Sequence, residues 1–349
     1  MNNPYSSLPN YNFWYKSVSI PPSGSVDPVV KSFKISIDDK VATMGSCFAQ
    51  HLSKNIRKHG FNYFITESCP NNLTSIEGLK FNYGIFSARY GNVYTVKQAL
   101  QLFDRAFNLV DFNENIWERD GSFVDAFRPL IEPNGFASKD DLLNDRVVHL
   151  KNVRKIFEES NWLIFTLGLT EAWQSKVDNA IFPVAPGVNS GSFDVTLHEF
   201  VNFSVYDVID QLNMFIEKCK SVNPKLKIIL TVSPVPLVAT YENRHVLTST
   251  VASKSILRAA SDFIERKFSD VVYFPSYEII TSPSSDGKYF EDDFRGVKEI
   301  GVNHVMRVFS KHFFTNDNVK LTNEDLIYHD FDIVCDEEVI ANALNIAGY

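Results

Sequence analysis

The residues with the clearest chemical potential follow a short apolar run near position 40. The stretch KVATMGS (40–46) has the pattern of a buried strand, and helical periodicity begins directly after it. Ser46 therefore stands at a strand-to-helix turn that Gly45 makes possible. Backbone N–H groups and the helix dipole at such a turn favour a developing anion. Ser46 is thus placed to be a nucleophile beside an oxyanion hole, although an ordinary helix cap has the same sequence.

The rest of the chain alternates short apolar runs with helical periods. We expect strands at 40–46, 61–66, 161–168, 226–233 and 271–279, and helices at 48–60, 205–219, 253–268 and 297–313. Strands separated by helices indicate an α/β fold with a mostly parallel sheet covered on both faces. Such sheets bind ligands beyond the carboxyl ends of their strands, so the residues at those ends are the ones to inspect.

Three segments do not follow this alternation. Residues 1–33 contain five prolines and are expected to form an extended arm over a domain at 34–314. Residues 103–150 are polar with scattered aromatics, which favours a helical insertion. Residues 315–349 are acidic and are expected to form an appended tail.

Composition excludes several function classes. The chain has 349 residues and a formal net charge of −8, which argues against nucleic-acid binding through a basic face. The four cysteines show no C-x-x-C pair, and no His, Asp or Cys cluster has the spacing of metal ligands, so no metal is expected. The N-terminal segment lacks a basic stub followed by an apolar stretch, so we expect a cytoplasmic protein without a membrane span.

Several short blocks in order identify a family. The segment GSCFA at 45–49 is followed by FSARYGNVYT (86–95), FTLGLTEAW (165–173), TVSPVP (231–236), SKSILR (253–258) and FPSYE (274–278). Together these blocks resemble the GSCFA-domain family, which is related to the SGNH (GDSL-like) esterases and acyltransferases. The resemblance covers about residues 40 to 310 and implies an SGNH-hydrolase-like (flavodoxin-like) parallel sheet flanked by helices.

The resemblance also implies roles for individual residues. It makes Ser46 the nucleophile rather than Cys47, whose thiol is an alternative and which we expect to be buried. The backbone N–H of Ser46 would share the oxyanion with Gly91 and Asn92 in the second block. In the third block the family has an Asn where this chain has Thr170 after Gly168, which implies a differently built oxyanion hole.

The last block departs further from the family pattern. The run Asp292-Asp293-Phe294-Arg295 stands where SGNH enzymes have D-x-x-H. Arginine stays protonated and cannot be a general base, so Arg295 is expected to bind an anionic group of a substrate. Two histidines remain as candidate bases, with Asp292 orienting the imidazole. His245 follows the strand at 226–233, and His304 is nearer to Asp292 but lies well into the last helix.

Other residues near the strand ends are candidates for substrate binding. Trp173 could stack on a sugar ring, and Glu171 offers a carboxylate beside it. Lys254 and Arg258 lie four apart on one helix face, which suits either an anionic polymer or contact with solvent. Glu278 could place a helper carboxylate in the cleft.

The predicted function is that of a serine esterase or O-acyltransferase of SGNH type, with an acyl-enzyme on Ser46. The family resemblance implies a carbohydrate or surface-polysaccharide substrate. No cofactor is required, although acetyl-CoA is a possible acyl donor. The alternative is a catalytically reduced glycan-binding module of a polysaccharide-assembly complex, in which Arg295 and Thr170 mark a site that holds a glycan without cleaving it. The sequence leaves the oligomeric state open.

Overall fold

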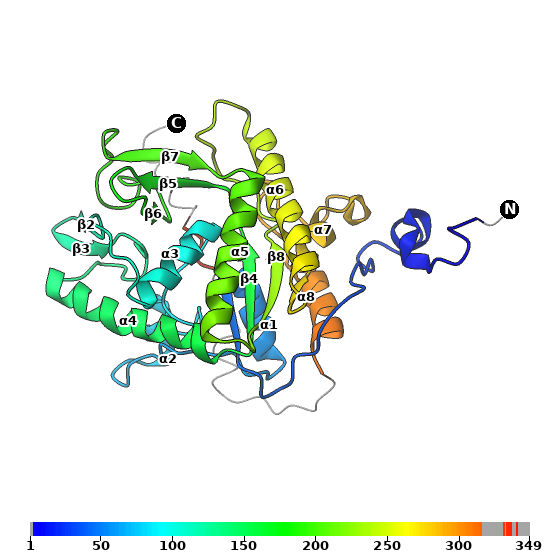
Figure 1. Ribbon diagram of the computed structural model, residues 1–349, viewed down its shortest axis with the longest axis horizontal. Helices are drawn as coiled ribbons and strands as arrows, with labels where there is room; N and C mark the ends of the chain where they lie inside the picture. The colour runs from blue at the N-terminus through cyan, green and yellow to red at the C-terminus, as the bar shows by residue number, and fades with distance from the viewer. Residues whose placement is uncertain (1–2, 316–330, 332, 337–339, 341–349) are drawn as a thin grey trace.

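A parallel sheet forms the centre of the protein (Figure 1). The computed structural model describes residues 3–315, 331, 333–336 and 340. The strands of the central sheet are β1 (Val41–Gly45), β4 (Trp162–Leu167), β8 (Lys227–Val232) and β9 (Val271–Tyr273), in the order β1-β4-β8-β9 and parallel throughout. Nearly every residue of these strands is buried, which explains why they read as continuous apolar runs in the sequence.

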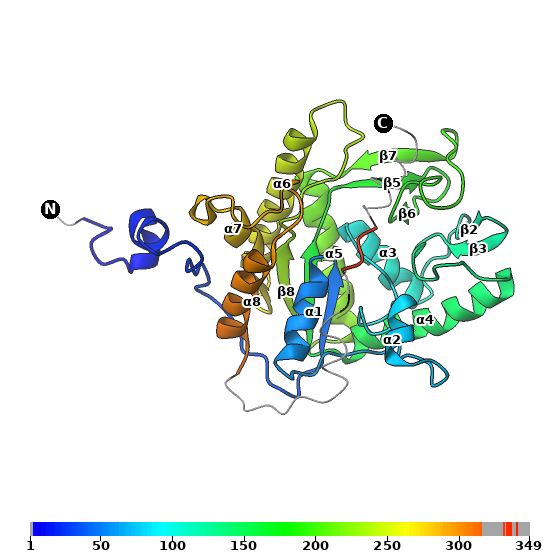
Figure 2. The ribbon, with the colours of Figure 1, turned by 180° about the vertical axis from the view of Figure 1, so that it is seen from behind.

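Helices cover both faces of this sheet (Figures 1 and 2). One face carries α3 (Val96–Ala106), α4 (Lys139–Glu159), α5 (Val205–Val222) and α6 (Val246–Lys267). The other face carries α1 (Ala49–Lys58), α7 (Ser276–Thr281) and α8 (Glu299–Phe313). Side chains of β4 alternate between the two cores, with Phe165 in the first and Ile164 in the second, as the two-residue period of a strand requires. The predicted α/β class with a flanked parallel sheet is confirmed.

A second, antiparallel sheet lies beyond the carboxyl ends of the central strands (Figure 1). It contains β5 (Glu171–Ser175), β6 (Ile181–Phe182) and β7 (His198–Asn202) in the order β6-β5-β7. This sheet is not among the predicted elements, because its strands are short and polar at many positions. It forms a wall above the site at which β1 and β4 end.

The segment at 103–150 is not purely helical, so that prediction was wrong in part. Strands β2 (Ile116–Arg119) and β3 (Ser122–Asp125) form an antiparallel hairpin between α3 and α4. Asp120 and Gly121 make the two-residue loop with φ values of 49° and 81°. Two consecutive positive φ values are the mark of a type I′ turn, for which Asp-Gly is a favoured pair. The Asp-Gly dipeptide was the signal that would have predicted the hairpin.

Two predicted strands are shorter in the structure. At 61–66 the chain makes a single parallel bridge, between Tyr63 and Val41, instead of a full strand. At 271–279 the strand ends at Tyr273 and α7 begins at Ser276. Pro275 lies between them and has no N–H with which to continue the ladder. The short helix α2 (Ser75–Lys80) completes the elements on the β1 side.

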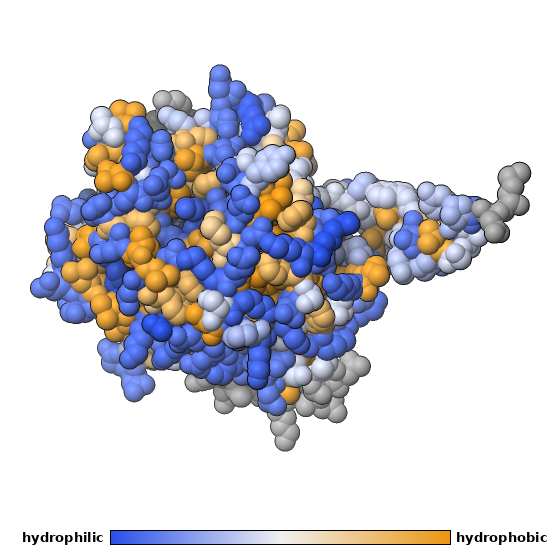
Figure 3. Space-filling model, viewed as in Figure 1, coloured by the Kyte–Doolittle hydropathy of each residue, from blue (hydrophilic) through white to orange (hydrophobic). Residues whose placement is uncertain are grey.

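The N-terminal residues divide into a projecting part and a packed part (Figures 1 and 3). Residues 3–20, with a 3-10 turn at Asn10–Asn12 and a π-turn at Tyr15–Ser19, extend away from the body. Trp14 and Tyr15 are exposed there, whereas Val26, Val29 and Ile35 are buried. Of the expected tail at 315–349, most lies outside the described residues; those described near the end of the chain pack near α1 and α3 (Figure 2).

Candidate active site

The turn after β1 has a geometry that only glycine permits. Gly45 has a φ of +132°, and a Cβ on it would lie 2.2 Å from the Thr166 carbonyl oxygen of β4. The next N–H, that of Ser46, donates to the same oxygen at 3.0 Å. The Ser46 N–H therefore continues the β1–β4 ladder, and the expected role of this group as an oxyanion donor is not available in this conformation.

Two hydroxyl groups at this strand end, those of Ser46 and Thr166, are buried without a hydrogen-bond partner in the described part of the chain. Ser46 is 3% exposed, and its Oγ has no hydrogen-bond partner within the described part of the chain. Leaving a buried hydroxyl unpaired costs about 1–3 kcal/mol, so such a group calls for an explanation such as a catalytic role. Its neighbour Cys47 is also buried, as expected.

The loop Gly91–Tyr94 holds Ser46 and Gly168 together. The Val93 N–H donates to the Gly45 carbonyl at 2.8 Å, and the Tyr94 carbonyl accepts from the Gly168 N–H at 3.0 Å. A Cβ on Gly168 would lie 3.0 Å from Ser46 Cβ and 3.1 Å from Tyr94 Cδ1. The second and third sequence blocks therefore meet the first at Ser46, which is the arrangement that the family resemblance implied.

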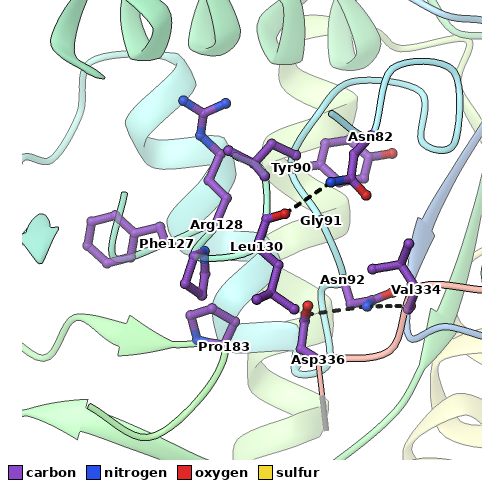
Figure 4. A pocket seen from close by; sticks show the side chains of 12 residues that line it. Asn82, Tyr90, Gly91, Asn92, Phe127, Arg128, Leu130, Pro183, Val334 and Asp336 are labelled. Atoms are coloured by element: carbon purple, nitrogen blue, oxygen red, sulfur yellow. Dashed lines mark hydrogen bonds between the residues drawn. The ribbon is translucent and has the colours of Figure 1, made fainter. Parts of the chain in front are cut away.

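The Asn92 amide of this loop is held by Val334 and Asp336, near the C-terminus (Figure 4). Its Nδ2 donates to the Val334 carbonyl at 2.9 Å and to Asp336 Oδ2 at 3.3 Å. Its Oδ1 accepts from Gln50 Nε2 at 3.1 Å. Gly91, with a φ of +73°, turns the chain just before Asn92, and a Cβ there would meet no atom within 4 Å.

Thr170, expected in the oxyanion hole, instead links three elements. Its Oγ1 lies 2.8 Å from Asn202 Oδ1 of β7 and 3.1 Å from Ser253 Oγ of α6. Its N–H also donates to Ser253 Oγ, at 3.1 Å. The Thr170 hydroxyl donates its single proton to Asn202. Together with the contacts to Ser253, this bond holds the turn after Gly168 in place.

The structure does not bring the expected histidines to Ser46. His304 lies between the Tyr289 hydroxyl, which donates to Nδ1 at 2.7 Å, and the Val26 carbonyl, which accepts from Nε2 at 2.8 Å. Burial lowers the pKa of His304, so the ring is a neutral structural link to the N-terminal segment. His245 is exposed and caps α6, its Nδ1 accepting from the Leu247 N–H at 3.2 Å. These contacts leave no hydrogen bond from either ring to Ser46 Oγ.

The late acidic block lies at the far edge of the sheet. β1 and β9 are the opposite edges, so three strand spacings of roughly 4.8 Å separate Ser46 from the strand before this block. Asp292 is fully exposed, 3.8 Å from Lys298. Arg295 is partly buried on the same loop, and its N–H donates to Asp293 Oδ1 at 2.9 Å. A catalytic unit of Ser46, Asp292 and a histidine is therefore not assembled.

A lysine that we expected to face solvent or an anionic polymer is buried instead. Lys254 on α6 is 1% exposed, and its Nζ donates to the Gly168 carbonyl at 2.8 Å. It shares the inward face of α6 with Leu257, Ser261 and Ile264. The spacing 254, 257, 261 and 264 is the signal in the sequence that could have located it on that face. Gly168 thus contacts Ser46 on one side and an ammonium group on the other.

Two further predictions on this side of the molecule are corrected. Arg258 Nε pairs with Glu278 Oε1 at 2.6 Å rather than facing an anionic ligand. Glu278 also accepts from the Tyr273 hydroxyl at 2.8 Å. With both groups paired to each other at the β9 edge, Glu278 is not a helper carboxylate in the cleft.

An apolar cleft of roughly 260 Å³ opens between the second sheet and α3, beside Tyr94 and Leu169. Glu171 and Trp173 of β5 line it, as does Tyr241. Trp173 meets Tyr241 edge to face, with ring centroids 4.8 Å apart. Glu171 Oε1 accepts from Thr240 Oγ1 at 2.7 Å, and burial raises the pKa of Glu171. Two of the residues predicted to bind substrate therefore share one wall of one cleft.

Comparison with known proteins agrees with this arrangement of blocks. The model of the GSCFA family matches residues 40–309, which is most of the chain. The chain belongs to the GSCFA family. No curated protein matches this GSCFA chain. Among the described residues, no group of His, Cys, Asp and Glu side chains could hold a metal ion, and no helix there is long and apolar enough to cross a membrane.

Two solved structures resemble parts of the GSCFA protein. One is a protein from Streptococcus pneumonia named after platelet activating factor, with 13% identity and a TM-score of 0.27, covering 50% of this chain and 68% of that chain. The other is an acetyl esterase with a serine-to-alanine substitution and an acetate ion, with 12% identity and a TM-score of 0.30, covering 78% of this chain and 95% of that chain. TM-scores this low carry no argument about function.

Proposed function

We propose that this GSCFA protein cleaves or transfers acyl esters through a covalent acyl group on Ser46. The observation that carries the proposal is the buried Ser46 Oγ, which has no hydrogen-bond partner in the described chain. Ser46 lies beside Gly168 at the strand end, where a Cβ on Gly168 would be 3.0 Å from Ser46 Cβ. In the first step Oγ attacks the ester carbonyl, the bond to the leaving oxygen breaks, and the hydroxyl proton passes to that oxygen, so the leaving group departs as an alcohol. Water or a hydroxyl group of an acceptor then takes the acyl group.

The groups around Gly168 support charge stabilisation in this reaction. The Lys254 ammonium group donates to the Gly168 carbonyl, so a positive charge lies directly behind the turn that touches Ser46. In a site closed to water such a charge stabilises a developing oxyanion more than it would in solvent. Asn92 would add its amide once released from Val334 and Asp336.

The apolar cleft supports a carbohydrate ester as the substrate class. An aromatic side chain beside a carboxylate, here Trp173 and Glu171, suits the apolar face and the hydroxyl groups of a sugar ring. A raised pKa lets Glu171 donate a hydrogen bond over a wider pH range than an ordinary glutamate does. If the protein transfers acyl groups in the cytoplasm, acetyl-CoA is the donor that the proposal favours.

A glycan-binding module without catalysis is the second candidate. It is favoured by the histidines, because neither His245 nor His304 is hydrogen-bonded to Ser46 Oγ. A serine hydroxyl requires a group that takes its proton before it attacks an ester. This candidate keeps the cleft around Trp173 as its binding site.

Covalent labelling separates the two candidates. The full chain is incubated with a fluorophosphonate, and the modified residue is identified by mass spectrometry. The enzyme predicts modification of Ser46 that Ser46→Ala abolishes and Cys47→Ala spares. The binding module predicts a different result. Ser46 then stays unmodified even when a reagent can reach it, and the chain still binds an acetylated glycan in calorimetry.

A further inference from the structure

The described C-terminal residues contact the side chains that surround Ser46. We refer to residues 333–336 as the strap. The Gln50 amide pairs with the main chain of Val334 in both directions, Nε2 to the carbonyl at 2.7 Å and the Val334 N–H to Oε1 at 2.9 Å. Gln50 lies on α1, one turn after Ser46. The strap is therefore fastened to the first turn of the helix that follows the candidate nucleophile.

The other attachments of the strap are to Asn92 and Tyr94 of the second sequence block, and Asn92 is itself hydrogen-bonded to Gln50. Asn92 Nδ2 donates to the Val334 carbonyl and the Asp336 carboxylate, and the Asp336 N–H donates to the Tyr94 hydroxyl at 3.0 Å. Tyr94 is the residue whose ring lies beside Gly168. In Figure 2 this red segment runs between α1 and α3. The strap thus contacts both α1, directly after the first sequence block, and the second sequence block.

Residues on both sides of the strap are anchored as well. Phe331 is buried in the α3–α6 core, and its carbonyl accepts from Lys54 Nζ on α1. Ile340 lines the apolar cleft. The described residues near the C-terminus therefore contact both the surroundings of Ser46 and the cleft in which we propose that the substrate binds.

We propose that the strap is an autoinhibitory segment that must leave Asn92 and Gln50 before a substrate reaches Ser46. This inference rests on the proposed function and concerns access to the same serine. Ser46 Oγ is buried in this structure, and the Asn92 amide is already occupied by the Val334 carbonyl and the Asp336 carboxylate of the strap. A carboxylate oxygen on an amide donor occupies the place that a substrate oxygen would need.

The balance of forces allows such a segment to open. Ile333 and Val334 of the strap are only partly buried where they pack against the α3–α6 core, and each hydrogen bond of the strap stabilises only modestly because water replaces it on release. Ordering the same residues costs backbone entropy of comparable size. A segment of this kind opens by local unfolding while the central sheet stays folded.

Cys335 is a native reporter of strap opening. It lies in the strap and is buried, with its Sγ 4.0 Å from the Tyr94 hydroxyl. The rate of its alkylation by iodoacetamide, mapped by mass spectrometry, measures opening without any catalytic activity. Cys219 on α5 is fully buried in the core and provides the reference for global unfolding.

The test compares the full chain with Val334→Pro, which removes the N–H that Gln50 accepts. Asp336→Ala removes one of the two acceptors of the Asn92 amide, and Asp336→Asn keeps an acceptor as its matched control. Phe112→Ala, a buried phenylalanine in a different cluster, controls for general destabilisation. We expect Val334→Pro and Asp336→Ala to speed both Cys335 alkylation and fluorophosphonate labelling of Ser46 by about tenfold, with Cys219 unchanged.

Two results would overturn the proposal. One is faster alkylation of Cys335 with unchanged or slower labelling of Ser46, since the strap would then complete the site rather than block it. The other is an alkylation rate of Cys335 that Val334→Pro does not change. If the fluorophosphonate labels Ser46 in none of these variants, the alkylation rate of Ser46→Cys tests the strap instead. That reaction requires only that iodoacetamide reach position 46. If Val334→Pro speeds alkylation of this cysteine, the strap does block access to position 46, although the proposed function fails. If the rate is unchanged, the strap does not block access and the inference is wrong.

Discussion

Ser46 and Gly168 lie so close that a Cβ on Gly168 would be 3.0 Å from Ser46 Cβ. The two residues end neighbouring parallel strands, β1 and β4, and the Tyr94 carbonyl holds Gly168 in position. The geometry at Ser46 therefore depends on the absence of a side chain at Gly168, because any side chain there would displace either Ser46 or the Tyr94 ring.

The first prediction concerns this contact. Gly168→Ala should lower kcat/KM for an activated ester by roughly 10- to 100-fold, since a misplacement of about 1 Å near the reacting atoms has effects of this size. Gly91→Ala is the comparison, because its added Cβ meets open space and costs only backbone strain. Ester hydrolysis and thermal unfolding of both variants check the prediction, and a larger kinetic effect at Gly91 would contradict it.

Removing the Ser46 hydroxyl should not destabilise the fold. Ser46→Ala deletes a buried oxygen that makes no hydrogen bond in the described chain, so the melting temperature should stay the same or rise. Ester turnover should fall by several orders of magnitude. A melting temperature several degrees lower, measured by differential scanning fluorimetry, would mean that the hydroxyl has a structural partner.

Lys254 should matter for both stability and turnover. Lys254→Met keeps the length of the side chain but leaves the Gly168 carbonyl without its donor, at a cost of about 1–3 kcal/mol. We expect kcat for an ester to fall while KM changes little, because the lost charge acts on the developing oxyanion. Chemical denaturation and steady-state kinetics measure the two effects. Turnover at the native rate in Lys254→Met would restrict this residue to a structural role.

The buried ring of His304 should make stability depend on pH. Its pKa is lowered by burial in the folded state, whereas the unfolded ring takes up a proton below its usual value of about 6.5. The unfolded state therefore binds more protons in acid, so this contribution to the free energy of unfolding is complete above about pH 6.5 and is lost as the pH falls. His304→Gln should flatten that part of the profile between pH 7 and 5 in denaturant titrations.

The same variant also tests the assignment of the base. His304→Gln should leave labelling of Ser46 by a fluorophosphonate unchanged, because the ring faces Tyr289 and Val26. Loss of labelling, with the chain folded by circular dichroism, would restore His304 as a candidate.

The aromatic wall of the cleft is testable without catalysis. Trp173→Ala should weaken binding of an acetylated oligosaccharide by about tenfold, since a stacked aromatic ring contributes on the order of 1 kcal/mol. Phe193→Ala is a suitable control, because Phe193 contacts Trp173 but does not line the cleft. Calorimetry on both variants checks the prediction, and equal losses would point to an indirect effect on the second sheet.

Local patterns predicted the central fold and the strand-to-helix turn that bears Ser46. The apolar runs at 40–46, 161–168 and 226–233 became β1, β4 and β8, because strands buried on both faces must be continuously hydrophobic. Gly45 and Ser46 then follow from the turn between a strand and a helix. Each of these features depends on neighbours in sequence, so the order of residues is sufficient to find it.

Only the tertiary structure decided what surrounds Ser46. Lys254 lies more than 200 positions from Ser46 in the sequence, and the two meet through Gly168 because α6 packs against the sheet beside it. The candidate histidines lie elsewhere, since His304 is bonded to Tyr289 and His245 caps α6. Residues 333–336 reach the site from the other end of the sequence. Periodicity and propensity act over a few residues, whereas these contacts depend on the order of strands in the sheet and on which helix covers which face. The sequence therefore determined which element bears the serine, and packing across the sheet determined its neighbours.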